Sequence, residues 1–153
     1  MNKDVKYQSI IRDIISNKEF EEIENIIHHG TTRLVHSKRV SYCSYKIAVF
    51  LRLNSESCAR AGLLHDFFTS AEDRTKIQRF ISTFTHPKYA LKNASAFFEL
   101  TDLEKDIIRK HMFPINLSIP KYAESWLVSF VDKIVTIYDF ISSRKIIKKL
   151  SHR

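Results

Sequence analysis

The scarcity of turn-forming residues is the feature that most restricts the fold of this chain. Its 153 residues include only 2 Gly and 3 Pro, whereas a sheet protein needs many tight turns built from these residue types. Apolar residues make up 44% of the chain, with 11 Phe and 6 Tyr, which is enough for a packed core and too aromatic for a disordered chain. The length suits one ordinary domain. We therefore expect an all-α helical bundle that occupies residues 1–153 as a single domain.

Apolar spacing and capping residues place the expected helices along the chain. Thr31 or Thr32 should cap the third helix and Ser55 the fourth. Pro87 suits the first turn of a helix, and Thr101 begins a capping-box sequence. The predicted helices cover about residues 4–16, 19–28, 32–53, 55–67, 71–82, 87–99 and 102–112, then 121–150 as one long helix or two shorter ones, with the longest loop at 112–120.

Charge and cysteine usage indicate the compartment and the kind of partner. The chain has 25 Lys and Arg against 17 Asp and Glu, so its formal net charge is +8, which suits an anionic partner. Cys43 and Cys58 stand singly in apolar stretches without a CxxC spacing, and we predict buried thiols in a reducing compartment. The sequence has neither a signal-peptide core nor an apolar run long enough for a membrane span. We expect a cytoplasmic protein without a membrane partner.

The third expected helix carries a histidine on its apolar stripe. His36, Val40, Cys43, Ile47 and Phe50 follow the i, i+4, i+7, i+11, i+14 spacing of one helix face. A buried imidazole needs a partner, because an unsatisfied polar group in a core is costly. His36 is therefore a candidate site residue.

Three further helices also direct ionisable groups inward. His65 and Asp66 close an apolar helix, His111 lies one turn beyond Ile107, and Asp132 stands among the valines of SWLVSFVDKIVTI. Each could be a separately satisfied core residue, since isolated buried polar side chains are common. A metal centre would satisfy all of them together, because imidazole and carboxylate groups are natural metal ligands and helix bundles often build such sites.

These residues resemble the motifs of the HD superfamily of metal-dependent phosphohydrolases. The first histidine motif, the His-Asp motif and the final aspartate motif are matched by TTRLVHSKRVSYCSYKIA, ARAGLLHDFF and SWLVSFVDKIV. FTHPKYALKNA and EKDIIRKHMFP resemble the segments that carry two further histidines in two-metal members. The resemblance covers about residues 28–140 and implies an HD-type helical bundle. The implied metal ligands are His36, His65, Asp66, His86, His111 and Asp132.

Within the superfamily, the pattern most resembles the small bacterial di-iron hydrolases that split symmetrical dinucleoside tetraphosphates. Arg33 precedes His36 by three residues, as an Arg precedes the first histidine in those enzymes. Two differences from those enzymes bear on which substrate is bound. Pro87 follows His86 where those enzymes usually have Gly, and the charged segment SAEDRTKIQRF follows the His-Asp motif.

The resemblance implies hydrolysis of a nucleotide or another small phosphorylated metabolite. One or two divalent transition-metal ions would activate a water, with iron favoured by the resemblance and Mn, Co, Ni or Zn also compatible with N/O ligands. Asp66 would be the catalytic bridging residue between two ions, with His36 and Asp132 on one ion and the remaining histidines on the other. Arg33, one turn before His36, could hold a substrate phosphate, and Lys133 is a second candidate for that role.

Two other functions stay open from the sequence. A nucleotide-sensing HD domain would bind the same ligand without turning it over. A basic nucleic-acid-binding helical domain is suggested by the tail RKIIKKLSHR, but a charge of +8 is modest beside dedicated nucleic-acid binders, and nucleic acid is not the expected partner. The sequence does not determine the oligomeric state.

Overall fold

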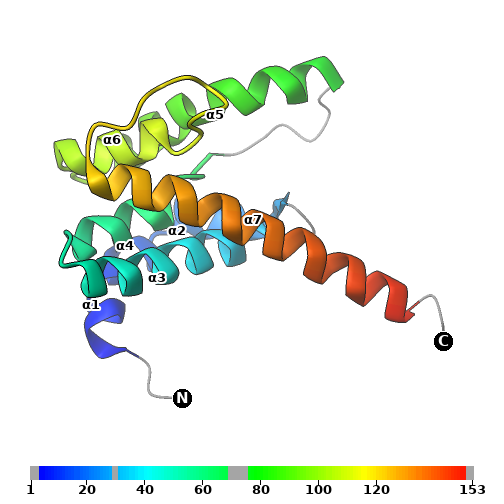
Figure 1. Ribbon diagram of the computed structural model, residues 1–153, viewed down its shortest axis with the longest axis horizontal. Helices are drawn as coiled ribbons and strands as arrows, with labels where there is room; N and C mark the ends of the chain where they lie inside the picture. Colours follow the sequence, from blue (N-terminus) through cyan, green and yellow to red (C-terminus); the bar gives the residue numbers. More distant parts are fainter. Residues whose placement is uncertain (1–3, 29–30, 69–75, 151–153) are drawn as a thin grey trace.

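Helices dominate the part of the chain that this computed structural model describes, which is residues 4–28, 31–68 and 76–150 (Figure 1). The expected all-α fold is confirmed. The helices are α1 (Val5–Ile15), α2 (Lys18–Glu21), α3 (Arg33–Leu51), α4 (Ser55–Leu64), α5 (Lys76–Phe97), α6 (Asp102–Lys110) and α7 (Ala123–Leu150). A 3-10 turn, η1 (Glu22–Asn25), precedes a short antiparallel pair of two-residue strands, β1 (Ile27–His28) and β2 (Thr31–Thr32), in which Ile27 lies opposite Thr32.

The bundle is built around α4, which packs against α1, α3 and α6. Helices α3 and α7 are antiparallel. The Asn54 N–H, just after the end of α3, donates to Glu124 at the start of α7, and His36 at the start of α3 contacts Asp139 farther along α7. Helix α7 also packs against α6, and α5 lies beside α6. In Figure 1 the C-terminal half of α7 extends past the rest of the bundle. Among the described residues, no helix has both the length and the apolar character needed to cross a membrane.

Small residues let α3 and α4 approach closely. A Cβ atom added to Gly62 would lie 3.1 Å from the Cα atom of Ser41, so a larger residue there would push the helices apart. The Ser41 hydroxyl donates to the Ala59 carbonyl at 2.6 Å and accepts from the Tyr7 hydroxyl at 2.9 Å. This contact brings the rings of His36 and His65, which sit on these two helices, to 5.5 Å between centroids.

The predicted apolar stripe of α3 is wrong in its second half. His36 and Val40 are buried, but Cys43, Ile47 and Phe50 are exposed, so Cys43 is not the buried thiol that we expected, whereas Cys58 is buried. The buried face of α3 turns instead toward small and polar residues, among them Ser37, Ser41, Ser44 and Ala48. Hydrophobic periodicity cannot identify such a face, because serine carries no apolar signal.

Residues 19–28 do not form the single predicted helix. Asn17 caps α2, which ends at Glu21, and after η1 the backbone pairs as strand β1 with β2. Helix α3 is capped by Thr32, one of the two residues predicted for this role. Helix α4 is capped by Asn54 rather than Ser55 and ends at Leu64, three residues earlier than expected.

The region after the His-Asp motif also differs in one respect from the prediction. Residues 76–97 form one helix, α5, with Pro87 inside it rather than in the first turn of a separate helix. Proline has a helical φ angle, so the helix can pass through it at the cost of one backbone hydrogen bond. Residues 69–75, where a helix from 71 was predicted, lie outside the described residues. The capping box of α6 is confirmed, and α7 is one long helix.

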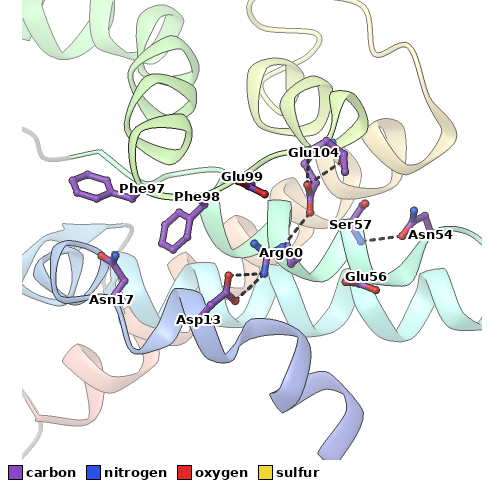
Figure 2. Close-up of a pocket in the computed structure, with 11 residues that line it drawn as sticks. Asp13, Asn17, Asn54, Glu56, Ser57, Arg60, Phe97, Phe98, Glu99 and Glu104 are labelled. Carbon is purple, nitrogen blue, oxygen red and sulfur yellow. Dashed lines mark hydrogen bonds and ion pairs between the residues drawn. The ribbon is translucent and has the colours of Figure 1, made fainter.

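A half-buried arginine joins three helices beside an acidic hollow of about 670 Å³ (Figure 2). Arg60 on α4 donates to both carboxylate oxygens of Asp13 on α1, at 2.8 and 2.9 Å, and its Nε lies 3.3 Å from Glu104 on α6. Glu56 and Glu99 also line the hollow, which makes it unsuited to a phosphate. Arg60 therefore serves as a structural link between helices.

Replacing Arg60 should destabilise the fold. In Arg60→Ala the buried Glu104 carboxylate loses its ionic partner, and we expect the free energy of unfolding to fall by about 2 kcal/mol. Chemical denaturation followed by circular dichroism measures this change. Lys105→Ala, which removes an exposed ion pair with Asp102 on the same helix as Glu104, is the matched control and should cost less than about 0.5 kcal/mol. Equal losses in both variants would contradict the role of Arg60.

Candidate metal centre

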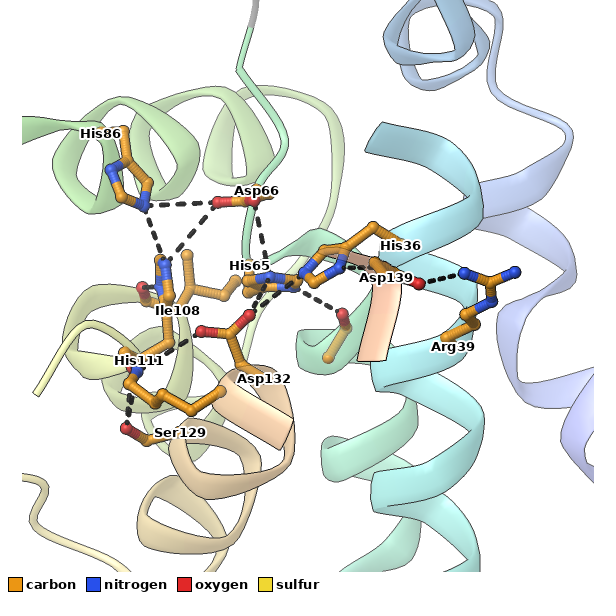
Figure 3. A network of polar contacts seen from close by, with 12 residues as sticks. His36, Arg39, His65, Asp66, His86, Ile108, His111, Ser129, Asp132 and Asp139 are labelled. Carbon is orange, nitrogen blue, oxygen red and sulfur yellow. Dashed lines mark hydrogen bonds and ion pairs between the residues drawn. The ribbon is translucent and has the colours of Figure 1, made fainter. Parts of the chain in front are cut away.

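Six ionisable side chains from five helices or their ends converge in the interior (Figure 3). All six are buried, and they are the residues that the sequence analysis selected as ligands. They are His36 on α3, His65 and Asp66 at the end of α4, His86 on α5, His111 at the end of α6 and Asp132 on α7.

His36 is held between two aspartates of α7. Its Nε2 atom lies 3.1 Å from Oδ1 of Asp132, inside the cluster, and its Nδ1 atom lies 2.9 Å from Oδ2 of Asp139, on the outer side. Asp139 is buried and also accepts a hydrogen bond from Arg39. A carboxylate that accepts from one ring nitrogen of a histidine fixes the ring and makes the other nitrogen a better ligand.

His65 and His111 are oriented by the helices that they terminate. Each follows the last residue of its helix and contacts the carbonyl three residues earlier through Nδ1, at 2.8 Å to Gly62 and 2.8 Å to Ile108. Because a carbonyl only accepts, Nδ1 must carry the proton in both rings. When the ring is neutral, the lone pair of its Nε2 atom then faces the interior.

Asp66 lies between the histidines of the cluster. Its Oδ1 atom is 3.4 Å from Nε2 of His86 and 3.6 Å from Nε2 of His111, and its Oδ2 atom is 3.6 Å from Nε2 of His65. The Nε2 atoms of His86 and His111 are themselves 3.0 Å apart. Three imidazoles thus point their Nε2 atoms toward one carboxylate.

The packed charges shift the pKa values of the metal-free cluster. Burial lowers the pKa of His65, but the Asp66 and Asp132 carboxylates outweigh it and raise this pKa to about 9. Burial lowers the pKa of His111 to about 3, with repulsion from His65 and His86 acting in the same direction. Burial opposes ionisation of Asp132, yet attraction to His36 and His65 holds its pKa well below the usual range. Neutral His111 and charged Asp132 are both in the form that binds a metal.

The donor atoms fit a divalent transition metal. Three sets have ligand atoms within 4.8 Å of one another: His36, His65 and Asp66; His65, His111 and Asp132; and Asp66, His86 and His111. The Nε2 atom of His65 is buried and has no hydrogen-bond partner among the described residues, although it faces two carboxylates. An imidazole nitrogen buried in this way is costly unless a ligand satisfies it. Nitrogen and oxygen donors without thiolate suit iron, manganese, cobalt, nickel or zinc.

The three sets overlap, so the side chains do not separate cleanly into two groups. His65, Asp66 and His111 each belong to two sets, whereas His36, His86 and Asp132 belong to one each. His36 and His86 lie at opposite ends of the cluster in Figure 3, with Asp66 between them. This placement is compatible with Asp66 as a shared ligand.

The two residues predicted to bind substrate lie beside the cluster. Arg33 is buried, donates to the Phe68 carbonyl and has its guanidinium carbon 3.9 Å from the centre of the Phe68 ring. That ring also stacks against His86, with centroids 5.2 Å apart. Lys133 is half-buried, donates to the His111 carbonyl and lies 3.4 Å from Asp132. Arg33 is thus linked to His86 through Phe68, and Lys133 contacts His111 directly.

Sequence reasoning missed three residues that position the cluster. Asp139 orients His36, Ser129 donates to the carbonyls of His111 and Phe113, and Phe68 stacks on His86. Asp139 carried a usable signal, because it follows Asp132 by seven residues and so shares its helix face. Ser129 and Phe68 carried none, since their contacts join segments far apart in the sequence.

A known protein family matches most of the sequence. The family model described as HD domain covers residues 33–137, which contain all six residues of the cluster. Neither the curated proteins nor the solved structures gave a match.

Asp139 should strengthen metal binding without being a ligand. In Asp139→Asn the negative charge behind His36 is lost, and we expect metal affinity to fall by about 10- to 100-fold, measured by competition with a chromogenic chelator. Asp106→Asn is the matched control, because Asp106 is a carboxylate on α6 with several hydrogen bonds outside the cluster. Unchanged affinity in Asp139→Asn, or the same loss in both variants, would show that Asp139 has a structural role only.

Metal uptake at pH 7 should release a proton. With a pKa of about 9, His65 is charged in the metal-free protein at pH 7 and must lose its proton to become a ligand, whereas His111, with a pKa of about 3, is already neutral. Affinity should therefore rise about tenfold per pH unit and level off above pH 9. Calorimetry in buffers of different ionisation enthalpy counts the protons. A proton count of zero at pH 7 would contradict this assignment of His65.

Proposed function

The chain belongs to the HD domain family, and from that membership and the buried cluster we propose that it is a metal-dependent phosphohydrolase. The observation that carries the proposal is the gathering of four histidines and two aspartates into one buried cluster, with the His65 Nε2 atom lacking a hydrogen-bond partner among the described residues. We propose that the whole sequence, residues 1–153, works as one HD-type domain.

Hydrolysis of a phosphoanhydride or phosphoester needs a nucleophilic water and neutralised phosphate oxygens. A divalent metal bound by the six residues would supply both, by lowering the pKa of a water and by attracting phosphate oxygens. Neighbouring groups of the protein fix the orientation of the ligand atoms. The Gly62 and Ile108 carbonyls fix the Nδ1 protons of His65 and His111, and Asp66 presents both of its oxygens to the cluster.

Cationic groups beside the cluster would favour an anionic substrate. The Lys133 ammonium lies at the edge of the cluster and is 30% exposed, so it can meet a phosphate without complete reorganisation. Arg33 is buried and donates a hydrogen bond to the Phe68 carbonyl. We propose one of two roles for it: it positions His86 through the stacked Phe68 ring, or its guanidinium leaves the Phe68 carbonyl to bind a substrate phosphate. The net charge of +8 adds a general attraction for anions.

We propose a nucleotide as the substrate, with symmetrical dinucleoside tetraphosphates as the first compounds to test and iron as the first metal. The resemblance of the motif order to the di-iron hydrolases supports both choices. Pro87 and the charged segment SAEDRTKIQRF distinguish this protein from those enzymes. Pro87 directly follows His86 within α5, so this difference bears on the part of the site nearest that histidine. A cytoplasmic setting would provide such substrates.

The proposal is tested by turnover after metal reconstitution. Protein loaded separately with Fe²⁺ under anaerobic conditions, Mn²⁺, Co²⁺, Ni²⁺ or Zn²⁺ is offered dinucleoside polyphosphates, mononucleotides, monoesters and diesters, with products resolved by chromatography. We expect hydrolysis of at least one class with at least one metal. No hydrolysis across the panel would overturn the proposal, and a nucleotide that raises the melting temperature but is recovered intact would support a sensing role instead.

Asp66→Ala should abolish turnover. Removal of the central carboxylate takes a ligand from two of the three donor sets, so we expect activity below about 1% of the parent together with reduced metal content by elemental analysis. Asp102→Asn, an exposed carboxylate at the start of α6, is the control and should retain activity and metal. Unchanged metal content in Asp66→Ala would contradict the assignment of Asp66 as a ligand.

A further inference from the structure

The outward face of α7 carries an apolar stripe that the bundle leaves largely uncovered, apart from Leu127, which packs against the edge of the core. Leu127, Phe130, Ile134, Ile137 and Ile141 succeed one another at intervals of three, four, three and four residues. Leu127 is half-buried and the other four are exposed, with Phe130 at 65% and Ile137 at 60%. An apolar repeat with a mean spacing of 3.5 residues is the pattern by which one helix packs along another.

The opposite face of the same helix is already occupied. Asp132 and Asp139 contact His36, and Ser129 contacts the end of α6, so this face is buried against α3 and α6. The stripe lies on the other side, since its members fall about half a turn away from these residues. None of its five residues carries a charge. Helix α7 therefore has one face that the bundle covers, which carries these polar residues, and an apolar face that the bundle leaves largely exposed.

We propose that this stripe pairs with the same stripe of a second copy of the protein, with the two α7 helices antiparallel about a two-fold axis. In that arrangement Ile134 lies opposite its own equivalent, Phe130 lies opposite Ile137, and Leu127 lies opposite Ile141. Each copy then contributes the same surface, as a two-fold interface requires. The single aromatic ring of the stripe meets a smaller aliphatic side chain, which lets the two surfaces interlock.

The exposed area is sufficient for a dimer. Trp126 and Tyr138 flank the stripe and are also about half exposed. With about 200 Å² for a whole aromatic side chain, Trp126, Phe130 and Tyr138 at 47%, 65% and 58% exposure leave roughly 340 Å² accessible, and three half-exposed isoleucines of the stripe add to this area. A standard protein interface buries about 800 Å² on each partner. The face thus approaches the size of a stable interface from one helix alone.

A second copy fits this face better than a lipid surface does. A helix that lies in a membrane interface has an exposed polar face rich in Lys and Arg, whereas the polar residues opposite the stripe, Ser129, Asp132 and Asp139, are packed inside the bundle. Of the cations near the stripe, the Lys133 ammonium donates to the His111 carbonyl and the Arg144 guanidinium lies 4.3 Å from the Phe140 ring. Lipid does not select a 3.5-residue spacing, but a partner helix does.

Light scattering coupled to size-exclusion chromatography tests the pairing with the full-length protein. At tens of micromolar we expect twice the 18.0 kDa mass of one copy for the parent protein and a twofold drop to the single-copy mass for Ile137→Lys. Val49→Lys is the matched control, an equally exposed apolar residue on α3 outside the stripe, and should stay dimeric. Circular dichroism confirms that both variants are folded. A monomeric parent, or a dimer that Ile137→Lys does not weaken, would overturn the proposal.

A cross-link tests the antiparallel register. In a Cys43→Ser background, which removes the exposed native thiol, Ile134→Cys should form an intermolecular disulfide when diamide oxidises the two thiols, whereas Val49→Cys should not. Equal cross-linking of both variants would overturn the register.

Flotation with vesicles of phosphatidylcholine and phosphatidylserine tests whether the stripe binds lipid instead. If the parent protein is monomeric and floats with the vesicles, and Ile137→Lys does not float, the proposed pairing of two copies would be overturned and binding of the stripe to lipid would be supported.

Discussion

The burial of two aspartates among four histidines is the constraint on which the rest of this structure depends. An unpaired carboxylate in a protein interior is costly, and so is an imidazole nitrogen without a partner. Asp66 and Asp132 can be buried because histidines from α3, α4, α5 and α6 surround them. The helices must therefore be held in one arrangement, and the small residues between α3 and α4 allow the closest of these approaches.

Helix ends provide much of the positioning. His65 and His111 each stand just after a helix, where carbonyl groups lack partners within the helix, and each ring uses one of those carbonyls to fix its proton. His36 lies within a helix and cannot use this device, so the carboxylate of Asp139 takes the place of the carbonyl. The same chemical requirement, a proton held on Nδ1, is thus met in two ways according to where the histidine lies.

Helix α7 joins the chemistry of the interior to the outer surface. Its inner face carries Asp132, Ser129 and Asp139, and its outer face carries the uncharged stripe from Leu127 to Ile141. A contact on the outer face would restrict the movement of a helix that supplies a member of the metal cluster. The proposed pairing and the proposed catalytic site therefore share one rigid element, although neither requires the other for its test.

Local signals in the sequence were enough to determine the helical class, a cap at Thr31 or Thr32, the cap at Thr101, and five of the six buried ionisable residues, whereas His86 was added by the resemblance to the HD superfamily. These depend on spacing within one helix, on turn chemistry and on the rarity of His and Asp at apolar positions. Only the tertiary structure decided which face of α3 is buried, that α5 continues through Pro87, and that Asp139 and Phe68 support the histidines. The reason is physical: these features depend on contacts between residues far apart in the sequence, where serine, proline and a stacked ring leave no periodic trace.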